Sequence, residues 1–172
     1  MRRRPRPWLL LAGLLAAAGA LASGQEDIPR LRECSYCGMD RKAYGFARAL
    51  VQYQDGSEVG TCSLHCAVTE LDAHPEKRLK ALLVADRNTH QLIESTSANW
   101  VMGGRKRAVM AARPKWAFST PEAATAFIRE SGGELVSWPQ ALAAAREDVA
   151  REARTKATRA PPRAFGCASP AA

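Results

Sequence analysis

The chain has 172 residues, and 47% of them are hydrophobic, which suits one compact domain of ordinary size. Its formal net charge of +8 at pH 7 does not indicate nucleic-acid binding, because the excess lies at the two ends. Residues 1–6 hold four arginines, residues 151–163 hold five basic groups against one acidic group, and residues 23–150 hold sixteen of each. A nucleic-acid-binding protein would show a basic patch on its folded part, so nucleic acid is excluded as a partner.

Residues 1–22 have the pattern of a secretory signal peptide. A basic start precedes an almost wholly apolar run, residues 8–22, and Ala20-Leu21-Ala22 is an A-x-A-like cleavage site. This run is shorter than a transmembrane helix requires. We therefore expect export to the periplasm with cleavage after Ala22, and an uncleaved N-terminal anchor is the alternative.

Two cysteine motifs follow a polar segment, residues 23–33, which is expected to be a flexible lead-in. Each motif offers ligands for a metal ion: Cys34, Cys37 and Met39 within residues 34–39, and Cys62, His65 and Cys66 within residues 62–66. Thiolates and thioethers are soft donors that favour Cu(I) over hard cations. Our working hypothesis is that the chain brings both motifs together around one metal ion.

The segment between the two motifs predicts a β-hairpin. Residues 43–54 mix aromatic and branched side chains with polar ones, Asp55-Gly56 is a tight-turn signal, and residues 58–62 form the returning strand. An antiparallel return places the two ends of a hairpin side by side. The hairpin therefore predicts that the two cysteine motifs meet.

Short elements are expected beyond the second motif. Apolar residues at helical spacing predict a helix over residues 64–72. Its N-terminus would stabilise a thiolate at Cys66. Further extended segments are predicted at residues 79–85, 91–94, 100–102, 116–118 and 134–137.

Two later helices carry clear start signals. A capping box and an early proline, in Ser119-Thr120-Pro121-Glu122, precede a predicted helix over residues 123–130. The same pattern, in Ser137-Trp138-Pro139-Gln140, precedes a predicted helix from residue 141 to about 153. Residues 155–172 have little apolar content and are expected to be a disordered tail. The fold class is α+β, with short antiparallel strands and about three helices.

The cysteines by themselves admit several interpretations. In an exported chain, the close pairs Cys34–Cys37 and Cys62–Cys66 could be disulfides. The same four thiols could form a tetrahedral zinc site, with His65 in reserve. A redox dithiol is disfavoured, because no long helix begins at the first motif.

Both motifs, the Asp55-Gly56 hairpin and the later stretch ending at Met110 resemble the NosL family, the copper accessory proteins of nitrous-oxide reductase. The resemblance runs in order over residues 34–142, and the metal-binding domain is assigned to residues 34–154. It implies a monomeric periplasmic Cu(I) carrier, not an enzyme, with a fold similar to part of the organomercurial lyases. The implied partner is a client cuproenzyme or other copper-delivery machinery.

The resemblance also implies particular ligands. The family's Cys-Gly-Met falls on Cys37, Gly38 and Met39, and its later Gly-Pro-Met is kept only at Met110. Cu(I) is therefore expected on Cys37 and Met39, with Met110 or His65 completing the site. Many family members are lipoproteins, and this chain lacks their acylated cysteine. The second motif also resembles small treble-clef metal modules, so Zn(II) on the four cysteines remains the alternative, in a structural or metal-sensing role.

Overall fold

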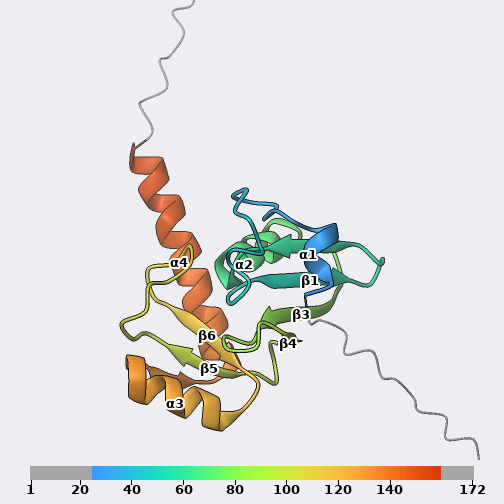
Figure 1. The fold of residues 1–172 in the computed structure, drawn as a ribbon. Coiled ribbons are helices and arrows are strands. Elements are labelled where there is room, and N and C mark those ends of the chain that lie inside the picture. Colours follow the sequence, from blue (N-terminus) through green and yellow to red (C-terminus); the bar gives the residue numbers. More distant parts are fainter. Residues whose placement is uncertain (1–24, 160–172) are drawn as a thin grey trace, which may run out of the picture.

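The structure is a computed structural model that describes residues 25–159. These residues form two antiparallel sheets and three substantial helices (Figure 1), which confirms the expected α+β class. The proposed signal peptide, residues 1–22, lies outside the described residues. So do residues 160–172 of the expected tail, which contain the fifth cysteine, Cys167. None of the described helices has both the length and the apolar character needed to cross a membrane.

The first sheet contains the predicted hairpin. Val51 pairs with Val59 and Ala49 with Thr61, so the ends of the two strands lie side by side. At the tip of the hairpin, Gly56 has a φ of +87°, which a residue without a side chain adopts readily. In spatial order the strands are β2 (Glu58–Thr61), β1 (Ala49–Tyr53), β3 (Leu79–Ala85) and β4 (Leu92–Glu94).

Residues 43–48 differ from the prediction, because they form turns and are not extended. The amides of Ala47 and Arg48 both donate to the carbonyl of Tyr44, at 3.0 Å. This turn directs the Arg48 side chain into the interior, where Nη1 donates to the carbonyl of Gly45 at 2.9 Å. The buried Arg48 side chain is thus bonded to the turn that precedes β1. The aromatic and branched residues of this segment had predicted extended chain and gave no sign of this contact.

The second sheet is covered by a helix with the expected start. Its strands, in spatial order, are β6 (Lys115–Phe118), β5 (Asn99–Met102) and β7 (Glu134–Val136). Helix α3 (Pro121–Ser131) begins after Thr120, whose hydroxyl accepts a hydrogen bond from the amide of Ala123 at 3.2 Å. Apolar residues of α3 and of this sheet form one core cluster: Val101, Trp116, Phe118, Ala124 and Phe127.

Helices α2 (Leu64–Ala73) and α4 (Trp138–Arg159) pack against each other. Alanines of α4, including Ala141 and Ala145, enter the main core with residues of α2 and of the first sheet. The Trp138 ring stacks on Trp100 of β5 with a centroid separation of 5.4 Å. Helix α4 therefore joins the two sheets. It also continues through Arg159, so the expected disordered tail does not begin at residue 155.

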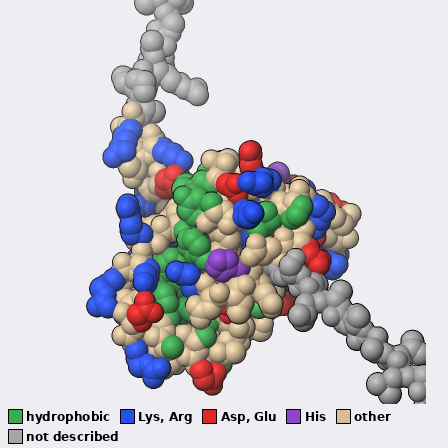
Figure 2. Space-filling model, in the orientation of Figure 1, with side chains coloured by type: hydrophobic (Ala, Val, Ile, Leu, Met, Phe, Trp, Pro, Cys, Tyr) green, Lys and Arg blue, Asp and Glu red, His purple; other side chains and the backbone are tan. Residues whose placement is uncertain are grey.

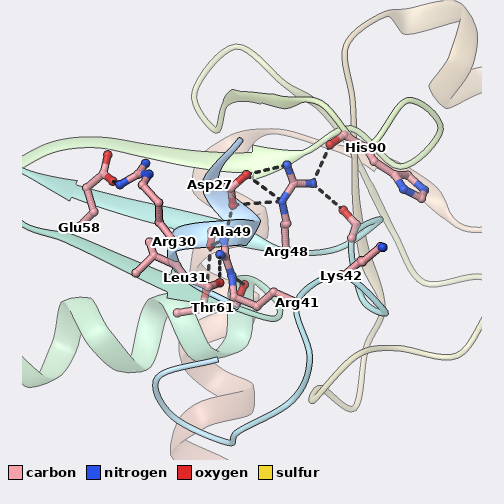
Figure 3. A network of polar contacts seen from close by, with 12 residues as sticks. Asp27, Arg30, Leu31, Arg41, Lys42, Arg48, Ala49, Glu58, Thr61 and His90 are labelled. Carbon is pink, nitrogen blue, oxygen red and sulfur yellow. Dashed lines mark hydrogen bonds and ion pairs between the residues drawn. The ribbon is translucent and has the colours of Figure 1, made fainter. Parts of the chain in front are cut away.

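The lead-in, residues 23–33, is not flexible throughout. It contains a short helix, α1 (Asp27–Arg30), in which Asp27 and Ile28 are buried. The Asp27 carboxylate accepts from Arg41 Nη2 at 2.6 Å and from Arg48 Nη2 at 3.0 Å (Figure 3). Both arginine side chains are fully buried. This ionic network holds the N-terminal segment against the first sheet.

Candidate metal centre

Four cysteine thiols converge on one point. The Sγ atoms of Cys34, Cys37, Cys62 and Cys66 all lie within 4.8 Å of one another. Cys37 Sγ is 3.5 Å from Cys62 Sγ and 4.0 Å from Cys66 Sγ, and the last two are 3.8 Å apart. All four are free thiols in this structure. Thus the two motifs meet as the hairpin predicted.

Local backbone hydrogen bonds form the loop that carries the first pair of thiols. The Cys34 amide donates to the Met39 carbonyl at 2.9 Å, and the Gly38 amide donates to the Cys34 carbonyl at 2.9 Å. These bonds close a tight loop, in which Gly38 adopts a φ of +72°. That left-handed conformation is easy only for glycine. Within the Cys-Gly-Met sequence, Gly38 is therefore the residue on which the shape of this loop depends.

The second pair is placed by a strand-to-helix junction. Cys62 directly follows β2, and Cys66 lies in the first turn of α2. Three thiols, those of Cys34, Cys62 and Cys66, are buried, whereas Cys37 lies at the surface. One edge of the cluster can therefore be reached from solvent.

Arg41 connects the segments that lead into the two motifs. Its buried guanidinium donates to the carbonyl of Leu31 at 2.5 Å, of Thr61 at 3.1 Å and of Ala49 at 3.0 Å. Leu31 precedes the first motif and Thr61 precedes the second. Sequence reasoning missed Arg41, because nothing near it in the chain indicates that it is buried.

Mutual hydrogen bonding separates the acidities of the thiols. Hydrogen bonds from Cys62 and Cys66 stabilise the Cys34 thiolate and lower the pKa of Cys34. The same bonds, with burial, raise the pKa of Cys62 to about 12 and also raise the pKa of Cys66. The stabilisation of a Cys66 thiolate expected from the start of α2 is therefore outweighed. A bound metal cation would displace the protons of these thiols.

The donor set suits a soft metal ion. Four thiolates about 2.3 Å from one tetrahedral ion would lie about 3.8 Å from one another. The sulfur separations among Cys37, Cys62 and Cys66 are close to this value, at 3.5–4.0 Å, and Cys34 Sγ lies within 4.8 Å of the other three. Thiolates select Cu(I) and Zn(II) over hard cations. The chemistry of these donors therefore fits either ion.

His65 faces α4 at the edge of a cleft. The cleft of ≈ 240 Å³ is lined by His65, Cys37, Cys66 and Met110, among others. His65 Nε2 lies 2.8 Å from a carboxylate oxygen of Glu152 on α4. His65 Nδ1 is buried and has no hydrogen-bond partner in residues 25–159. Sequence reasoning missed Glu152, which pairs with His65 across a long separation in the chain.

Comparison with known proteins assigns the family. The family model described as NosL matches residues 26–144. The chain belongs to the NosL family. This membership confirms the resemblance seen in the sequence and agrees with the expectation that the protein is not an enzyme.

Two further comparisons were made for this NosL-family chain, with solved structures and with curated proteins. The crystal structure of the copper chaperone NosL from Shewanella denitrificans has 23% sequence identity and a TM-score of 0.48, and the match covers 61% of this chain and 85% of that chain. No curated protein matches the chain at a significant level.

Of the two methionines of the NosL-like motifs, one packs against the buried cysteines and the other lines the cleft. Met39 is partly buried and packs against the buried cysteines, beside Tyr44 and Val109. Met110 is 37% exposed and lines the cleft with Cys37 and His65. Its φ of +55° is unusual for a residue with a side chain. The tertiary structure thus brings all seven expected ligands to the cluster or its cleft.

Proposed function

We propose that this NosL-family protein is an exported Cu(I) carrier, which passes the ion to a periplasmic cuproenzyme such as nitrous-oxide reductase. The observation that carries the proposal is the convergence of four thiols within 4.8 Å, one of them at the surface. Family membership supports copper as the cargo. The soft donor set supports the same ion.

The arrangement suits a cargo that must leave again. Cys37 lies at the surface, and both Cys37 and Met110 line the ≈ 240 Å³ cleft beside the thiols. An incoming thiol or thioether of the client can reach this edge and replace one ligand at a time. We expect Cys37 and Met39 to hold Cu(I), with Met110 or His65 completing the site.

A second candidate function is a structural or metal-sensing zinc site. The sulfur separations among Cys37, Cys62 and Cys66 favour it, because they lie close to those between thiolate ligands of a tetrahedral ion. In that case the metal would join the two motifs permanently, and its removal would unfold this part of the chain. Met39 and Met110 would then serve only as packing.

Anaerobic metal binding tests the proposal. Residues 23–172 would be purified without metal, and Cu(I) affinity would be measured against a chromophoric chelator, with Zn(II) as competitor. Met39→Leu keeps the volume and apolarity of the side chain, so we expect little loss of stability. The affinity for Cu(I) should nevertheless fall about tenfold or more, the range seen when residues that support a metal site are changed. Met102→Leu, on β5, is the matched control.

The opposite outcome would identify the zinc site. Met39→Leu would then bind Cu(I) as tightly as the parent protein. Cys62→Ser would abolish both Zn(II) binding and folding. That combination would replace the carrier with a structural zinc module.

A further inference from the structure

The C-terminal turns of α4 carry a concentrated positive charge. Four of their side chains, which we call the basic end of α4, are exposed: Arg151, Arg154, Lys156 and Arg159. In Figure 1 this part of the helix extends away from the remaining described elements, and Figure 2 shows Lys and Arg side chains gathered on it. In the sequence this charge counted as an excess at the chain end, with Lys156 and Arg159 in the expected tail, whereas the structure places all four residues on a helix of the folded part.

Packing does not account for this segment. Asp148 is the last buried residue of α4, and residues 153–159 are all exposed. Helices in proteins usually depend on an apolar face that packs on the core. Basic residues near a helix C-terminus do favour the helix dipole. That effect is confined to the last turn, which holds Lys156 and Arg159, so it leaves Arg151 and Arg154 without a role.

The charge is largely unneutralised. Glu152 is the one acidic residue in the same stretch, and it contacts both Lys156, at 2.6 Å, and His65. Within residues 25–159, no carboxylate forms an ion pair with Arg151, Arg154 or Arg159. Three guanidinium groups therefore face solvent without a partner from the described part of the chain.

The basic end adjoins the candidate metal centre. Lys156 lines the same ≈ 240 Å³ cleft as Cys37 and Cys66. Arg151 lines a neighbouring depression with His65 and Met110. A partner that contacts these cations would therefore be held beside the surface thiol, Cys37.

We propose that the basic end of α4 docks an acidic surface of the protein that receives the metal. The proposal rests on the proposed carrier function for the identity of the cargo. Exposed charges raise the rate of encounter with a partner of opposite sign and orient it, most strongly at low ionic strength. A protein partner is favoured over a membrane, because the apolar residues of the last two turns, Ala153 and Ala157, are too small to anchor a helix in lipid.

Two synthetic acceptor peptides test the docking surface. They would contain the same pair of cysteines, flanked by four glutamates in one and four lysines in the other. Binding to metal-free protein would be followed by fluorescence anisotropy, and Cu(I) transfer by stopped-flow spectroscopy. At about 20 mM salt we expect the parent to load the glutamate peptide about tenfold faster, and at about 500 mM salt the two rates should converge.

Charge reversal locates the effect. The test variant, Arg154→Glu/Arg159→Glu, changes two exposed residues of the basic end. The control variant, Arg78→Glu/Lys80→Glu, makes the same change in net charge at the start of β3, on another side of the molecule (Figure 1). The first variant should lose the tenfold preference and keep the parent's equilibrium affinity for Cu(I). The control variant should retain the preference.

Three results would overturn the proposal. The parent could show no preference between the peptides, or both double variants could lose it equally, which would indicate net charge alone. Metal-free protein could bind vesicles of anionic phospholipid more tightly than the glutamate peptide, which would indicate a membrane surface. Failure to bind Cu(I) would instead refute the carrier function, and anisotropy with metal-free protein would still measure docking.

Discussion

The buried network of Asp27, Arg41 and Arg48 makes a sharp prediction about stability. Both guanidinium groups are fully buried, and Asp27 is the carboxylate that pairs with each of them. Asp27→Asn keeps the shape of the side chain but removes its charge. It also places an amide donor where the carboxylate accepted hydrogen bonds from both arginines.

The expected cost is large. Removing one partner of a buried ion pair leaves an uncompensated buried charge and typically costs about 3–5 kcal/mol. A domain of this size has a total stability of about 5–15 kcal/mol. Asp27→Asn should therefore reduce the free energy of unfolding at pH 7 by about 3–5 kcal/mol, measured by urea denaturation with tryptophan fluorescence.

The pH dependence of the same pair of proteins supplies a second test. Burial alone would raise the pKa of Asp27, but hydrogen bonds and charges from Arg48 and Arg41 outweigh it, so the pKa of Asp27 lies below its ordinary value. The ionised carboxylate therefore stabilises the fold above the unfolded pKa of about 3.9, and this contribution disappears as the pH falls through the folded pKa. The difference between parent and variant should be constant from about pH 5 to 7 and shrink below about pH 4.

An exposed ion pair provides the control. Glu147 pairs with Arg113 on the surface, at 2.6 Å, and Glu147→Gln should cost less than about 1 kcal/mol. If Asp27→Asn cost no more than Glu147→Gln, or if the gap between parent and variant stayed constant below pH 4, the ionic account of the N-terminal segment would be refuted.

Three further predictions concern other parts of the chain. Gly60→Ala should destabilise the fold by about 1–3 kcal/mol in urea denaturation, because the new Cβ would lie 2.7 Å from the Arg41 guanidinium, which is fixed by its hydrogen bonds. A neutral result would show that the guanidinium can move. Truncation after Arg159 should leave the melting temperature and metal stoichiometry unchanged, and a loss of either would assign residues 160–172 to the fold or the site. Intact-mass measurement of the exported protein should show a chain that begins at Ser23, whereas retention of residues 1–22 would indicate an uncleaved anchor.

Much of the fold follows from local sequence patterns. Asp55-Gly56 closes the hairpin because glycine tolerates the backbone angle at its tip, and Thr120 starts α3 because its hydroxyl accepts an orphan amide hydrogen bond. The Cys-Gly-Met loop likewise depends on Gly38. Each signal acts between residues a few positions apart, so each can be recognised without knowledge of the fold.

The remaining features depend on residues that are distant in the chain. Asp27 meets Arg48 across 21 positions, and this contact orders a segment that polarity alone predicted to be flexible. His65 meets Glu152 only because α2 and α4 pack together. That packing, with the length of α4, also brings a basic helix end beside the thiols. The sequence alone determined which side chains could bind a metal and, through the hairpin, that the two cysteine motifs meet. Tertiary packing decided that His65 lies against Glu152 and that Met110 lines the same cleft as Cys37, since proximity between residues so distant in the chain arises only when the core forms.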